Sequence, residues 1–391
     1  MKRIFRYICI LIVLSAVAFC FILPAAAETE ENASSDMSAE QLYDEQLEAS
    51  GAGELDDALP DEYKEIIWDM GVKADDPSSI TDLGIGDIFS SLIQSVMDKA
   101  AAPIKSAAAV IAAVILCALC SGVATESANK QIGVIFTYIS ALVVGIIVIK
   151  PVTELAVSSI DAIKVCSAFM AAFIPVFAGI LIASGKIAAA ASAQTVLFTA
   201  TQLAGQAASI LIGPFISLYF GMAVTSSLSE EVRLNGICET IKKAAIWILG
   251  LIMTVFTAFL TIQSVINGAA DSVTSRAAKF AAGTFVPIVG TYISESLSTV
   301  QACLSLVKSG VGMYAVLAML IIIVPHIIAM IFWKLSLECG AAAADMFSLT
   351  KITGLLKAVS SGVSLLIALM ACFGILFIVC TGITVLTAGG I

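Results

Sequence analysis

Few residues in this 391-residue sequence are of the types that carry chemistry. The one histidine, His326, follows Pro325 inside an apolar run, so the chain has no second imidazole for a multi-histidine metal site. The sequence favours a neutral histidine that bonds a backbone carbonyl freed by the proline kink. The alternative is a functional ionisable group at membrane depth, but without a carboxylate in the same run it would be a poor proton relay.

Other motifs with catalytic potential are also weak. Cys117 and Cys120 form a CxxC, but they lie in an apolar segment where small buried cysteines usually serve packing. The run GILIASGK at 179–186 resembles a phosphate-binding loop but has one residue too many between its glycines. There is no HExxH and no GxSxG. We therefore predict no enzyme activity, no cofactor and no metal site.

The composition indicates which elements must position these residues. The chain is 59% hydrophobic and 13% charged, with a mean hydropathy of +1.02. A soluble domain is about 45–50% apolar and about 25% charged. A polytopic membrane protein fits this composition, and the bilayer is its expected partner, with no nucleic acid. Acidic residues are scarce in the apolar runs, which counts against an ion-coupled carrier.

The N-terminus predicts export. Basic residues precede an apolar run that ends at Ala25-Ala26-Ala27, so residues 1–27 read as a signal peptide, with an uncleaved anchor as the alternative. Residues 28–98 hold 20 acidic groups and two lysines and form the expected acidic extracytoplasmic segment. We expect disorder up to about Ala58, a short helix after Pro60, and an amphipathic surface helix over 87–104.

Residues 99–391 are predicted to form a multi-pass helical membrane domain. The fold class is thus all-α, a polytopic helical membrane protein with about eight transmembrane helices and additional interfacial or re-entrant amphipathic helices. The candidate spans are 107–124, 132–149, 166–185, 187–206, 208–227, 244–268, 311–333 and 363–387. We expect a tight turn near Gly205 and Gln206. Abundant Ala, Gly and Ser predict closely packed helices.

Four connecting segments are amphipathic rather than hydrophilic: 151–165, 228–243, 269–310 and 335–360. We expect them to lie at the membrane interface. Loop charge does not determine orientation, and the signal peptide alone places the N-terminus outside.

The segment 276–312 has a pattern of its own. Its uncharged core, Phe280 to Ile293, is too short to cross a bilayer and contains a Pro-x-x-Gly. We predict a re-entrant or interfacial element that meets a partner or lines a path, with a plain interfacial loop as the alternative. The residues that would carry this role are Arg276, Lys279, Pro287, Gly290, Lys308 and Gly312.

The same residues carry a family resemblance. The run R-x-x-K-F, then F-V-P-I-V-G, V-K-S-G-V-G and the later F-W-K-L-S resemble the stage III sporulation protein AE family of endospore-forming bacteria. Ser309 and Trp333 depart from the pattern.

The resemblance implies a multi-pass protein of the mother-cell membrane around the forespore. It would be a non-enzymatic subunit of a channel-like, secretion-like complex required for endospore development. The implied partners are other stage III sporulation A-operon membrane proteins and stage II sporulation protein Q. The alternative function is a self-contained permease for a small solute.

Overall fold

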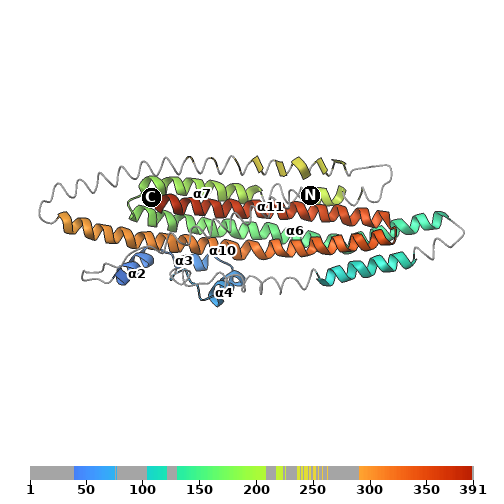
Figure 1. The fold of residues 1–391 in the computed structure, drawn as a ribbon, viewed down its shortest axis with the longest axis horizontal. Helices are drawn as coiled ribbons and strands as arrows, with labels where there is room; N and C mark the ends of the chain where they lie inside the picture. The colour runs from blue at the N-terminus through green and yellow to red at the C-terminus, as the bar shows by residue number, and fades with distance from the viewer. Residues whose placement is uncertain are drawn as a thin grey trace.

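The computed structural model describes residues 39–74, 76, 104–120, 130–207, 217–222 and 290–389, with isolated positions between 225 and 262. Within these residues the regular elements are helices, and the longest lie side by side in an elongated bundle (Figure 1). The expected all-helical class is therefore confirmed.

Three helices make up most of the bundle: α6 (Lys130–Ala183), α10 (Gly290–Met346) and α11 (Thr350–Gly389). At 1.5 Å per residue, the 54 residues of α6 extend about 81 Å and the 57 residues of α10 about 86 Å. The hydrocarbon core of a bilayer is only about 30 Å thick. Neither helix can therefore lie wholly within a membrane unless it is strongly tilted.

The fourth long helix, α7 (Ile187–Ala207), turns back along α6. The turn is a glycine-terminated helix cap, with Gly185 at φ +75°. The Gly185 N–H donates to Ile182 O at 2.9 Å, and the Lys186 N–H donates to Leu181 O at 2.9 Å. These two bonds satisfy the last carbonyls of α6 and reverse the chain.

The core of the bundle lies around α10. Every residue from Gly310 to Met319 is buried. The Tyr314 ring lies 6.4 Å from that of Phe169 on α6, and Ser159 on α6 donates to the Met330 sulfur at 3.9 Å. A helix that is apolar on all sides needs apolar surroundings. Here other protein elements supply them along this stretch.

Glycines permit the close approach of α10 and α11. A Cβ built on Gly312 would lie 2.3 Å from Val385 Cγ2, and one built on Gly374 would lie 3.1 Å from Ile323. No larger side chain fits at Gly312 unless the helices move apart. This is the small-residue packing that the sequence predicts.

The expected count of about eight spans is not confirmed. Three described helices are long and apolar enough to cross a membrane: 135–183, 309–346 and 350–382. The apolar helix Ile104–Cys120, near the predicted span at 107–124, is shorter. The predicted spans 208–227 and 244–268 fall largely outside the described residues, as does the surface helix over 87–104.

The predicted break between two spans at 151–165 is wrong, because α6 runs through it. Val152, Ala156 and Ile163 continue the buried face of the helix. Asp161 and Lys164 point outward and form an ion pair at 3.3 Å. The segment is amphipathic because one side of a continuous helix meets the bundle, and Pro151 is tolerated within it.

Two further boundaries differ from those expected. Gly205 and Gln206 are helical, because α7 continues to Ala207. The predicted connection at 335–360 is mostly helix, since α10 continues to Met346 and α11 begins at Thr350.

The contact at Gly312 generates a testable prediction. Gly312→Ala should lower the free energy of unfolding by about 1–3 kcal/mol, because the new methyl group overlaps Val385. Adding Val385→Ala should recover much of this loss. The control is Gly354→Ala on α11, where a Cβ meets nothing within 4 Å. Thermal unfolding of the purified chain measures the effect. Equal stability of the Gly312 and Gly354 variants would contradict the packing described.

Candidate functional site

The predicted site residues are only partly within the described structure. Arg276, Lys279 and Pro287 lie outside the described residues. Gly290 is the first residue of α10, and Lys308 lies on the same helix, although its side chain is not described. From Gly290 to Gly312 the chain is one continuous helix with no reversal. Of the six residues, Gly312 alone has described surroundings, and they are the packing contact with Val385.

A small helical cap lies against one flank of the bundle (Figure 1). It comprises residues 39–74 and 76, with α2 (Ala39–Ala49), α3 (Glu54–Asp57) and α4 (Asp61–Asp69). α2 and α4 contact α10, and α3 contacts α6. Asp61 and Glu62 occupy the first turn of α4, where negative charge favours a helix start.

The cap buries a face with a simple repeat. Leu55, Leu59, Tyr63 and Ile67 follow one another at four-residue spacing, and all are buried. The helix expected after Pro60 is confirmed by α4. The expected disorder up to Ala58 does not match the helices α2 and α3. Acidic composition suggested disorder, but Tyr43 and Leu47 on α2 show the same four-residue spacing and pack in or against the core, which is the signal that could have corrected it.

A carboxylate lies inside the contact between the cap and the bundle. Asp56 is buried, and its two oxygens accept separate hydrogen bonds. The Tyr314 hydroxyl on α10 donates to Oδ1, and the Ala74 N–H donates to Oδ2 at 3.3 Å. A buried polar group is costly unless it is hydrogen-bonded, so these two bonds make the burial of Asp56 tolerable. Sequence reasoning missed this pair because 258 positions separate its members.

The outward side of the cap is strongly acidic. Its exposed carboxylates are Asp44, Glu45, Glu48, Glu54, Asp57, Asp61, Glu62, Glu65, Asp69 and Asp76. Lys64 bonds Asp57 at 2.8 Å and lies 4.7 Å from the centre of the Trp68 ring. Burial, aided by nearby carboxylates, raises the pKa of Tyr43 and of Tyr63 to about 12. Both phenols therefore stay neutral throughout the physiological range.

A second polar cluster, which we call the polar layer, connects α10 and α11 with Lys242, a helical residue that precedes both in the chain. It consists of Lys242, Lys334, Glu338, Ser360 and Ser361. Lys242 donates to the Ser361 hydroxyl at 2.7 Å, Ser360 donates to Glu338 at 3.3 Å, and Lys334 lies 3.6 Å from Glu338. Burial lowers the pKa of Lys242, and the nearby Lys334 lowers it further. The polar layer thus places the charged groups of Lys242, Lys334 and Glu338 beside helices that are otherwise mostly apolar.

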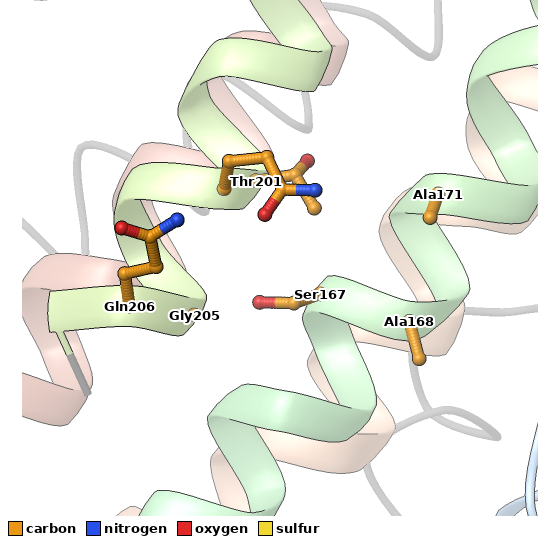
Figure 2. Close-up of a pocket in the computed structure, with 7 residues that line it drawn as sticks. Ser167, Ala168, Ala171, Thr201, Gly205 and Gln206 are labelled. Atoms are coloured by element: carbon orange, nitrogen blue, oxygen red, sulfur yellow. The ribbon is translucent and has the colours of Figure 1, made fainter. Parts of the chain in front are cut away.

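A third feature is an open notch of about 360 Å³ between α6 and α7. In Figure 2, Ser167, Ala168 and Ala171 on α6 face Thr201, Gly205 and Gln206 on α7. Gln202 completes the lining. The Ser167 and Thr201 hydroxyls donate to carbonyls of their own helices, at 2.9 and 2.7 Å. The exposed amides of Gln202 and Gln206 make the notch hydrogen-bonding but uncharged.

The histidine and the CxxC cysteines, which the sequence offered as candidates for chemistry, lie on helices of the bundle. His326 Nδ1 lies 2.8 Å from Ile322 O, so this nitrogen carries the proton that the carbonyl accepts. The sequence predicted a carbonyl freed by Pro325, which would be that of Ile321; the bond goes to the next carbonyl along the helix. Cys117 is buried and Cys120 exposed on the helix 104–120. No group of three potential metal ligands occurs within the described part of the chain.

The docking of the cap generates a second prediction. Tyr314→Phe removes the hydroxyl that bonds Asp56, leaving a buried carboxylate oxygen without this donor. We expect the cap to be destabilised by about 1–3 kcal/mol and to be cut faster by added protease at low concentration. The matched control is Asp57→Asn, which breaks an exposed ion pair worth about 0–1 kcal/mol. Equal cleavage rates for the two variants would show that the Asp56 contact does not hold the cap.

Comparison with known proteins identifies the family. The profile described as Stage III sporulation protein AE matches residues 77–388. Stage III sporulation protein AE of Bacillus subtilis (strain 168) is 22% identical over 400 residues, covering 100% of this chain and 99% of that protein. No solved structure matches. The family match begins at residue 77, after the cap, and takes in α6, α7, α10 and nearly all of α11, so this chain belongs to the stage III sporulation protein AE family.

Proposed function

We propose that this chain is a non-enzymatic integral membrane subunit of the mother cell–forespore channel complex that endospore development requires. The observation that carries the proposal is the family match across residues 77–388, which takes in the whole long-helix bundle. The family name places the protein in sporulation. The channel complex, its secretion-like character and the mother-cell membrane are the proposed setting.

The architecture supports a structural role in an assembly. Apolar helices of about 81 and 86 Å provide a rigid body longer than a bilayer is thick. The acidic cap adds a folded, charged surface at the flank of that body. In the proposed setting the cap lies outside the cytoplasm, because residues 1–27 direct export. The partners are other stage III sporulation A-operon membrane proteins and stage II sporulation protein Q.

Dependence on partners distinguishes this proposal from a self-contained permease. We expect the tagged full chain, purified from sporulating cells after mild crosslinking, to carry the other membrane subunits with it. An unrelated tagged multi-pass protein from the same cells is the control and should not. The purified chain alone in lipid vesicles should show no saturable solute uptake. Robust uptake without partners would support the permease and contradict the channel subunit.

The segment 276–312 remains our proposed contact with partners or with the transported path. The double variant Arg276→Gln with Lys279→Gln should weaken surface docking by about 1 kcal/mol per charge and reduce spore yield. Gly290→Leu, which favours helix across the Pro-x-x-Gly, should arrest sporulation more severely. The control is Lys357→Gln, which removes one exposed charge from α11. Spore yield is measured together with the abundance of each variant in the membrane. Normal yield from Gly290→Leu at normal abundance would contradict the proposed role and favour the alternative, a plain interfacial connection.

A further inference from the structure

The side chains that α6 exposes change in kind near Lys150. Before it, the exposed residues include six large aliphatic ones: Ile135, Ile139, Leu142, Val143, Ile146 and Ile147. From Thr153 to Ala183 the exposed residues are polar, charged or small, except Val157 and Ile182. Aliphatic side chains suit hydrocarbon, whereas charged ones such as Glu154 and Asp161 do not. One continuous helix thus presents two surfaces suited to different solvents.

α7 packs beside the second of these stretches and also faces outward with polar groups. Apart from Ile187 and Phe198, which are apolar, the large exposed side chains among its described residues are polar: Gln194, Thr195, Thr199, Gln202 and Gln206. The two threonine hydroxyls bond carbonyls of their own helix, at 2.9 and 2.7 Å. A glutamine carboxamide does not satisfy its hydrogen-bonding groups on its own helix in this way. Its burial in hydrocarbon without a hydrogen-bond partner costs several kcal/mol. Three exposed glutamines on one helix therefore indicate contact with water.

The cap lies at the same level on another side of the bundle. Tyr314, which bonds Asp56 of the cap, packs against Phe169, two residues from Ser167 in the notch. Figure 1 shows the cap and α7 on opposite sides of the bundle. The ten exposed carboxylates among the described residues of the cap cannot face hydrocarbon. The outward sides of the cap and of α7 therefore give this half of the molecule two largely polar surfaces on opposite sides.

The interior of this half does not require lipid to explain its apolar sequence. Gly310 to Met319 on α10 are all buried in protein contacts. Likewise, no described side chain on α11 is exposed from Ser361 to its last described position. These runs are apolar because they form the core of a helix bundle, as in a water-soluble protein.

Large exposed aliphatic side chains are more numerous at the other end of the bundle. The helix 104–120 exposes Ile104, Ile115, Leu116 and Leu119. It packs where Gly340 on α10 leaves room, since a Cβ there would lie 2.9 Å from Val110. The α10–α11 turn is at this end, as is the start of α6, because Lys351 lies 3.3 Å from the centre of the Tyr138 ring.

We propose that the bilayer's hydrocarbon contacts this chain, among its described residues, along the aliphatic belt. We define the belt as the exposed faces of 104–120 and of α6 from 135 to 147. The part of α6 from Thr153 onward, α7, the cap and the packed parts of α10 and α11 form a stalk that stands in water. The bilayer surface lies near Lys150. The predicted span at 166–185 and the span at 187–206 are then parts of this stalk.

The polar layer agrees with this boundary. Gly145 on α6 adjoins Leu355 on α11, with 3.4 Å between a built Cβ and Leu355 Cδ2. Lys150 therefore lies about level with Ser360, which bonds Glu338. Lysines at such a boundary can extend their ammonium groups to the lipid headgroups.

Thiol accessibility tests the proposal on the full chain with its native cysteines replaced. Single cysteines are placed at Gln202 and Gly179 in the stalk and at Ile139 and Ile146 in the belt. Both Gly179 and Ile146 have open surroundings, with nothing within 4 Å of a Cβ built on Gly179 and Ile146 70% exposed. Membrane vesicles are frozen and thawed so that a hydrophilic maleimide reaches water on both sides.

We expect the stalk cysteines to react at least about tenfold faster than the belt cysteines, because hydrocarbon suppresses the reactive thiolate. All four should react fully after denaturation in detergent. If Gln202→Cys fails to insert at normal abundance, Gln194→Cys replaces it.

Three results would overturn the proposal. Slow labelling at both Gln202 and Gly179 would place this half in lipid. Fast labelling at Gln202 with slow labelling at Gly179 would mean that the half crosses the bilayer beside a water-filled path. Fast labelling at Ile146 would show that the aliphatic belt does not contact hydrocarbon.

Discussion

Burial of α10 on all sides is the constraint on which the rest of the structure depends. From Gly310 to Met319 this helix has no polar face and must be enclosed. Each large aliphatic side chain gains about 1.5–3 kcal/mol by full burial, so enclosure is strongly favoured. α6, α11 and the cap supply the walls. The glycines at 312 and 374 let α11 approach closely enough for the enclosure to be dense. The antiparallel α10–α11 pair and the long parallel course of α6 follow from this requirement.

The cap is determined by the same constraint but adds a polar element to it. Its repeat of Leu55, Leu59, Tyr63 and Ile67 is apolar, and such a face alone could dock in more than one register. Asp56 removes that freedom. Its carboxylate is stable inside the interface only where the Tyr314 hydroxyl and the Ala74 N–H both reach it. The pair therefore sets where the acidic surface of the cap lies relative to the bundle.

For a subunit of the proposed sporulation channel complex, this arrangement offers three different surfaces. The aliphatic belt suits lipid, the cap presents acidic groups, and α7 presents uncharged amides beside the notch. A body about 80 Å long can present these surfaces at different heights above one membrane. That property is useful to a complex proposed to join two membranes, because contacts outside the bilayer need a scaffold that extends from it.

The sequence by itself determined what depends on neighbours along the chain. The all-helical class, the helix after Pro60 and the small-residue packing all follow from local hydrogen bonding and composition. The tertiary structure decided what depends on distant partners. Asp56 and Tyr314 meet across 258 positions. Residues 151–165 continue α6 because Val152, Ala156 and Ile163 find a bundle to pack on. Above all, hydropathy has the same value for a helix enclosed by protein as for one enclosed by lipid, so hydropathy alone could not decide which of the predicted spans face lipid. Only packing distinguishes the two, because it shows which atoms surround each apolar side chain.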